Sequence, residues 1–160
     1  MRSGVGMSAW LAGFLALSGA QTAAARDILD TLRASGNHAM FLVMVEQSGL
    51  AQSLRAPGPI TLLAPHDLAF RELEDGGGFE ILLSQPDRLR AIIAYHIIPG
   101  SVGSGGMSEG MAVPTTQGKE VVFLVEGGAM VNHARVLKAD IRADNGIIHA
   151  IDEVLLPPGF

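Results

Sequence analysis

The pattern of apolar and polar positions predicts that the chain after residue 25 begins with helices. Asp27 is placed to cap a first helix, which Gly36 ends. Asn37 is placed to cap a second helix, which contains the apolar run Met40–Val45 and ends at Gly49. Because this run is apolar on every side, the pattern predicts a helix that is buried on every side.

A strand and two more helices are predicted in the middle of the chain. Pro59–Ala64 is an apolar run of strand length that opens with turn-forming residues. Pro65 suits the first position of the next helix, where the carboxylate of Asp67 can accept hydrogen bonds from free first-turn amides. Glycines 76–78 break the chain, and Asp87–His96 is expected to form the last helix.

The final third of the chain changes to the two-residue period of β-strands. Val113–Thr116 can form an edge strand, and hairpins are predicted at Gly127-Gly128 and at Ala143–Gly146. Ile147–Leu156 is rich in β-branched residues and is expected to be a central strand. Helices followed by an antiparallel meander place the chain in the α+β class.

Residues 1–25 have the pattern of a secretory signal peptide. Arg2 precedes the apolar run Ala9–Leu17, and Ala23–Ala25 offers a cleavage site, with Ser18–Ala20 as an alternative. A retained membrane anchor is the other reading, but the run is shorter than the roughly 20 residues that span a bilayer. We therefore expect a cleaved signal peptide at 1–25, a single domain at 26–160, and a secreted or periplasmic product with no transmembrane anchor.

Charge and cysteine content narrow the function classes. The chain has 11 Lys and Arg against 16 Asp and Glu, a formal net charge of −5. Arg2 is the only charged residue before position 26, so the predicted domain has a net charge of −6. Nucleic-acid binding depends on clustered cations, so we expect no nucleic-acid partner. The chain has no cysteine, so its stability has to come from its core.

Three segments occur together in this one domain-sized stretch: Thr61–Phe70, Tyr95–Gly100 and Asn145–Pro157. In this order and at these separations they resemble the fasciclin-like domain, an extracellular adhesion and interaction module. The resemblance runs from about Asp27 to Pro157. His66 departs from the family motif, which has Thr or Asn between the proline and the aspartate.

The resemblance implies a β-wedge of two small sheets with helices packed along it. It also implies a non-enzymatic role in adhesion or protein–protein interaction, with a cell-surface or extracellular protein, or a glycan, as partner. The residues that carry the motifs are implied to be structural: Thr61, Pro65, Asp67, Phe70, His96, Asn145, Gly146, His149 and Asp152.

The second segment is also the candidate partner-binding site. In animal members the corresponding tyrosine–histidine region is implicated in receptor binding, which by resemblance selects Tyr95, His96, Ile97 and Ile98. The alternative is that these side chains belong to the core.

Two other functions stay open on the sequence. Asp67 and His96 could be the acid/base pair of an extracytoplasmic enzyme, or they could form a buried carboxylate–imidazole hydrogen bond that only stabilises the fold. The resemblance implies the second, and no serine has the nucleophile-elbow pattern, so we expect no catalytic residues. A carrier would instead bind a small apolar ligand in a cavity near Met40–Val45.

The five histidines do not predict a metal site. No two of them have the spacing typical of zinc or copper ligands, so neither a metal nor a cofactor is expected. His149 lies between apolar residues of an alternating strand, and we expect its ring to donate to a backbone carbonyl.

Overall fold

The computed structural model describes residues 26–159, apart from the side chain of Glu72. The predicted signal peptide lies outside these residues. The helices are α2 (Ile28–Ser35), α3 (Ala39–Ser48), α4 (Ala51–Arg55), the 3-10 helix η1 (Asp67–Phe70), α5 (Arg71–Asp75), α6 (Gly78–Leu83), α7 (Pro86–Tyr95) and the 3-10 helix η2 (Ser104–Gly106). The strands are β1 (Ile60–Pro65), β2 (Ile97–Pro99), β3 (Met111–Pro114), β4 (Glu120–Leu124), β5 (Met130–Val131), β6 (Ala134–Ala143) and β7 (Gly146–Ile151).

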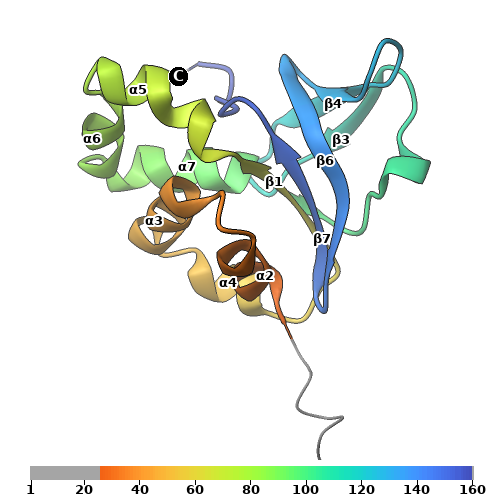
Figure 1. The fold of residues 1–160 in the computed structure, drawn as a ribbon, viewed down its shortest axis with the longest axis horizontal. Helices are drawn as coiled ribbons and strands as arrows, with labels where there is room; N and C mark the ends of the chain where they lie inside the picture. Colours follow the sequence, from red (N-terminus) through yellow and green to blue (C-terminus); the bar gives the residue numbers. More distant parts are fainter. Residues whose placement is uncertain (1–25, 160) are drawn as a thin grey trace, which may run out of the picture.

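The strands form a wedge on one side of the molecule, with η1 and helices α2 to α7 on the other (Figure 1). Their order is β2-β1-β7-β6-β5-β4-β3. The long strand β6 pairs with β7 along most of its length and with β5 at its start, so it joins two smaller sheets. This confirms the α+β class and the expected wedge. One pairing goes beyond the expected meander, because β1 lies parallel to β7.

The central position predicted for the last strand is confirmed. Strand β7 lies between β1 and β6. Strand β7 ends at Ile151 instead of continuing to Leu156, because both the backbone and the side chain of Asp152 bond to Arg135 of β6. The Asp152 N–H donates to the Arg135 carbonyl, and the Asp152 carboxylate accepts from the Arg135 N–H. The chain beyond β7 therefore runs as an irregular segment beside η1 and α5.

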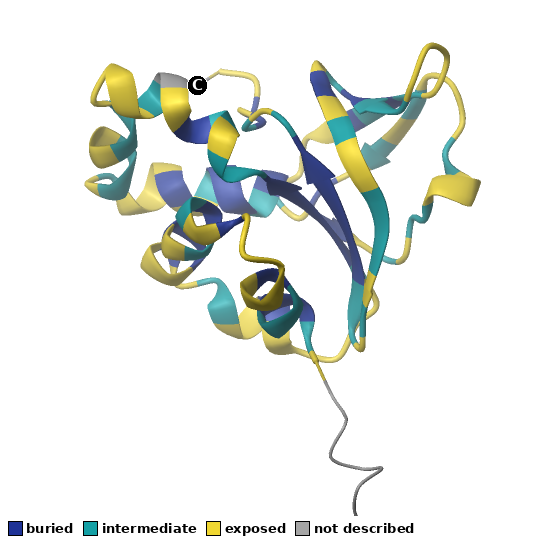
Figure 2. Cartoon of the chain, viewed as in Figure 1, coloured by how far each residue is buried: buried dark blue, intermediate teal, exposed yellow. Residues whose placement is uncertain are grey.

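Alternation along β1 builds two cores, one on each face of the sheet. Leu62 and Ala64 point to the core shared with the helices, whereas Leu63 points into the core between the two sheets. Ile148 and Ile151 of β7 divide in the same way. Figure 2 shows the buried residues concentrated on β1 and β7, the layer between these cores.

The wedge is held closed where its two outer strands approach each other. The backbone N–H of Thr116, two residues after β3, donates to the Ile97 carbonyl at 2.9 Å. The Thr116 hydroxyl donates to the Ala94 carbonyl at the end of α7, also at 2.9 Å. These contacts connect the far edge of one sheet to the helix–strand junction of the other.

The first helix is capped as predicted, and the second is not. Asp27 accepts a hydrogen bond from the Asp30 N–H, and Gly36 ends α2 in the left-handed region. For α3, the prediction that Asn37 is the cap is wrong: the capping position is His38, and the Met40 N–H donates to the carboxylate of Asp67 at 2.9 Å. The capping carboxylate thus comes from the start of η1.

Helix α3 is buried on one face only, which corrects the expectation from its apolar sequence. Phe41, Met44 and Val45 are buried, but the Val43 side chain is 43% exposed. The buried face packs against α7 and the helical core. The glycines at 76–78 also do more than interrupt the chain, since Gly77, with a φ of 72°, immediately precedes the unpredicted helix α6.

Candidate functional site

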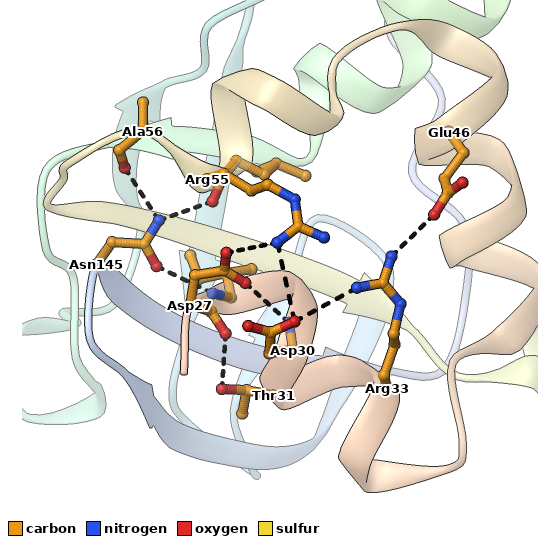
Figure 3. A network of polar contacts seen from close by, with 10 residues as sticks. Asp27, Asp30, Thr31, Arg33, Glu46, Arg55, Ala56 and Asn145 are labelled. Carbon is orange, nitrogen blue, oxygen red and sulfur yellow. Dashed lines mark hydrogen bonds and ion pairs between the residues drawn. The ribbon is translucent and has the colours of Figure 1, made fainter. Parts of the chain in front are cut away.

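The turn between β6 and β7 is a structural junction built around Asn145 (Figure 3). Its side-chain oxygen accepts from the Ile28 N–H at 2.9 Å. Its side-chain amide donates to the carbonyl oxygens of Leu54 and Ala56 at 2.7 and 3.0 Å. One side chain therefore joins the hairpin to the start of α2 and the end of α4.

Gly146 is required by the close approach of β1. A Cβ at this position would lie 2.0 Å from the carbonyl oxygen of Ile60 and 2.9 Å from Cδ1 of Ile28. A Cβ at Gly58 would similarly meet the carbonyl oxygen of Asn145 at 2.0 Å. The Asn-Gly pair of the third motif is thus explained by the hydrogen bonds of Asn145 and the close packing at Gly146.

An ion-pair network covers this junction (Figure 3). Arg55 contacts the carboxylate of Asp27 at 2.8 Å, and Arg33 contacts Glu46 at 2.9 Å. Asp30 lies between the two arginines, at 3.4 and 3.8 Å. Such largely exposed pairs contribute little to stability, so the network is an accessory to the Asn145 hydrogen bonds.

The first motif supplies further structural contacts. The Thr61 hydroxyl donates to the Gly100 carbonyl and accepts from the Val102 N–H, which holds the chain after β2. Phe70 is fully buried in the helical core. The carbonyl of Pro65 lies 2.9 Å from Nδ1 of the buried His38.

His66, the departure from the family motif, takes over a capping role. It is the residue before η1, and its Nδ1 accepts from the Leu68 N–H. The sequence predicts that Asp67 accepts hydrogen bonds from first-turn amides of its own helix, and this is wrong. Its carboxylate caps α3 instead.

The segment Tyr95–Ile98, the candidate partner-binding site, is buried in the folded domain. All four side chains are at most 4% exposed. The Tyr95 hydroxyl donates to the Glu120 carbonyl and accepts from the Asn132 side-chain amide. A partner cannot reach this segment without opening the wedge, so the core alternative describes these residues.

His96 is a buried connector and does not pair with Asp67. Its Nδ1 lies 2.7 Å from the Ile92 carbonyl, and its Nε2 accepts from the Leu155 N–H at 3.0 Å. The ring is therefore neutral, with its proton on Nδ1. Both readings of an Asp67–His96 pair, as acid/base catalyst and as stabilising hydrogen bond, are thus wrong: each side chain bonds to backbone groups elsewhere.

We expect the domain to lose stability in mild acid through His96. Burial lowers the pKa of His96 to about 4, against an opposing contribution from the Ile92 carbonyl. Because the unfolded histidine has a pKa of about 6.5, the unfolded state binds the proton first. The free energy of unfolding should be constant above that pH and fall by about 3 kcal/mol as the pH drops to about 4.

Urea unfolding at a series of pH values measures this effect, with His96→Gln as the comparison. The variant should show a flatter profile, although not a level one, because burial also lowers the pKa of His38. An identical pH dependence in both proteins would show that His96 is not responsible.

A serine, an aspartate and the motif residue His149 come together in a cluster that the sequence motifs do not indicate. The Ser104 hydroxyl donates to the Asp140 carboxylate, and hydrogen bonds from the Ser104 side chain and backbone lower the pKa of Asp140. Nδ1 of His149 accepts from the Asp140 backbone N–H, and its Nε2 lies 2.7 Å from the Val102 carbonyl. This confirms that the His149 ring donates to a backbone carbonyl.

This cluster does not have the connections of a nucleophilic triad. In a triad the serine donates to the histidine, and the carboxylate accepts from the other ring nitrogen. Here the serine donates to the carboxylate, and both ring nitrogens of His149 are occupied by backbone groups. Nowhere in residues 26–159 do three His, Cys, Asp or Glu side chains gather as they would around a metal ion.

A surface groove of about 480 Å³ lies between η1, α5 and the chain after β7. Leu68, Ala69 and Leu73 line one wall. The other wall consists of Asp152, Glu153, Val154 and Leu156. We call it the C-terminal groove. Its two walls are at least 79 positions apart in the sequence, so no local motif could have indicated it.

Comparison with known proteins places these features in a family. The fasciclin domain family model matches residues 36–157. Protein sll1483 of the cyanobacterium Synechocystis is 35% identical over 144 residues, which cover 89% of this chain and 79% of that protein. Human periostin is 31% identical over 137 residues, which cover 84% of this chain but only 16% of periostin.

A solved structure shows the same fold. The FAS1 domain pair of the insect cell adhesion molecule fasciclin I aligns with a TM-score of 0.57 at 20% identity, covering 76% of this chain and 46% of that one. Within residues 26–159, no helix has both the length and the apolar character that crossing a bilayer requires. From the family match over most of its length, the chain belongs to the fasciclin domain family.

Proposed function

We propose that this protein is a secreted or periplasmic interaction domain that binds other proteins at its surface and catalyses no reaction. The observation that carries the proposal is the fasciclin family match over residues 36–157, since the domain also occurs in an insect cell adhesion molecule. The partner is a cell-surface or extracellular protein.

The contacts of the motif residues support this proposal. Four motif side chains form hydrogen bonds with the backbone or with neighbouring side chains of the domain: Asn145, His96, His149 and Tyr95. A carrier would need a cavity near Met40–Val45, but this part of the helical core is filled by Phe41, Met44 and Val45. Binding therefore falls to exposed side chains outside the motifs.

A capture experiment tests the proposed function. The exported protein is immobilised and exposed to envelope and secreted fractions of the organism that encodes it, and retained proteins are identified by mass spectrometry. The matched control is an unrelated protein of similar size and net charge. We expect a protein that is retained only by the fasciclin domain and that binds it again when purified. Recovery of the same set on both supports would contradict the proposal.

We also propose that residues 1–25 are removed on export, because a charged start, a short apolar run and a small-residue site occur in this order. The intact mass of the exported protein measures the position of the cut. The expected species begins at or a few residues before Arg26. A species that retains Met1 would contradict this prediction.

A further inference from the structure

We propose that the C-terminal groove binds a short segment of the partner protein in which leucine-like side chains stand next to lysine or arginine. This inference rests on the proposed function and names the surface and the chemistry of the partner. It follows from three features of the groove: its exposed leucines, its charge and its fixed walls.

The groove exposes apolar side chains on both walls. Leu68 is 54% exposed and Leu156 is 45% exposed, and they face the solvent beside the partly buried Leu73 and Val154. Exposed leucines that share one concave surface are typical of a binding site, whereas single exposed leucines are common on any protein. A volume of about 480 Å³ lies in the range of small binding pockets and has room for a few side chains.

The charge of the groove selects a basic occupant. Among the described residues that line it, two are carboxylates, those of Asp152 and Glu153, five are apolar, and none is a lysine or arginine. Asp152 already accepts from the Arg135 N–H, but Glu153 has only an exposed contact with His133 at 3.0 Å. Such a contact is easily exchanged for a partner's cation. The same carboxylates disfavour an anionic membrane surface.

Both walls are held in place before any partner arrives. The N–H of Leu155 donates to Nε2 of His96, and the Leu155 side chain is fully buried between the two sheets. Val154 and Leu156 are therefore held on either side of a fixed residue. The opposite wall starts at η1, which His66 caps. A preformed groove loses little conformational freedom on binding, which favours affinity for a short segment.

Three labelled peptides test the chemistry of the occupant by fluorescence anisotropy with the exported protein. The probe is acetyl-Lys-Leu-Leu-Lys-Leu-Leu-Lys-amide, and its controls replace every lysine by glutamate or every leucine by serine. We expect saturable binding of the probe and about tenfold or greater weakening for each control. Equal binding of the glutamate peptide, or no binding of the probe, would overturn the proposal.

Variants then place the binding in the groove. Leu156→Asp and Glu153→Lys should each weaken the probe about tenfold, and Glu153→Lys should also reduce the salt dependence of binding. Leu137→Asp is the matched control, because Leu137 is 50% exposed on β6 and does not line the groove. Thermal melts check that each variant is folded. If Leu156→Asp does not fold, Glu153→Lys still tests the location, because Glu153 is exposed. A loss with Leu137→Asp equal to that with Glu153→Lys would refute the location.

The capture experiment separates this inference from the proposed function. If the unmodified protein captures a specific partner and Leu156→Asp and Glu153→Lys capture it equally well, the groove is not the binding surface and the proposed function stands. If the unmodified protein captures no specific partner, the proposed function fails, and the groove inference fails with it.

Discussion

Gly146→Ala is expected to lower the free energy of unfolding by about 4 kcal/mol or more, which places it among the most damaging single substitutions. The added Cβ would lie 2.0 Å from the Ile60 carbonyl oxygen, and this oxygen belongs to the neighbouring strand of the sheet. A side chain could rotate away, but a backbone atom can yield only if β1 and β7 separate. Urea unfolding followed by circular dichroism measures the loss.

Gly105→Ala is the matched control for this substitution. Gly105 lies in η2, and a Cβ there would have no heavy atom within 4 Å. We expect it to change the stability by less than about 0.5 kcal/mol, as is usual for exposed positions. Similar stabilities for the two variants would mean that β1 and β7 are not packed as described.

Asn145→Asp is expected to cost about 4 kcal/mol, although the side chain keeps its size and shape. The carboxylate can still accept from the Ile28 N–H, but it loses the two hydrogen bonds that the amide donates to Leu54 and Ala56. In their place a negative charge faces two carbonyl oxygens. The end of α4 should therefore detach from the hairpin.

The measurement is again urea unfolding, at neutral pH. Asn37→Asp serves as control, because Asn37 is exposed and the substitution introduces the same charge at a different site. Asn145→Ala should fall between the two, since it removes the three hydrogen bonds without adding a charge. If Asn145→Asp were no less stable than Asn145→Ala, the proposed contact with the carbonyl oxygens would have to be abandoned.

Local patterns in the sequence were enough for much of the fold. The apolar run of β1, the β-branched run of β7, the Asn-Gly turn and the capping of α2 by Asp27 all depend on neighbouring residues, so they can be recognised without a structure. The features that were missed depend on residues distant in the sequence. Asp67 caps α3 across 27 positions, and nothing near Met40 indicates it. The exposure of Val43 likewise depends on which side of α3 meets α7.

The site could be predicted only in part, for the same reason. The resemblance correctly gave the family, but it could not give the hydrogen-bond partners of His96. Asp67 and His96 are both polar residues in apolar surroundings, and pairing them was a natural reading of the sequence. In the structure each side chain instead forms hydrogen bonds with backbone groups. The two partners of His96, the Ile92 carbonyl and the Leu155 N–H, are 63 positions apart in the sequence.

The Asn145 junction also has a consequence for the chemical ageing of the protein. In an Asn-Gly pair the glycine nitrogen readily attacks the asparagine side-chain carbon, which closes a cyclic imide and releases ammonia. Water then opens the imide to aspartate or isoaspartate. In the folded domain the Asn145 amide is held by three hydrogen bonds, and Gly146 is fixed in register with Ile60, so the attack geometry is blocked. Unfolded molecules have no such protection. Each unfolded molecule that deamidates acquires the carboxylate that destabilises the Asn145 junction. The longer a molecule stays unfolded, the greater its chance of permanently losing the ability to refold.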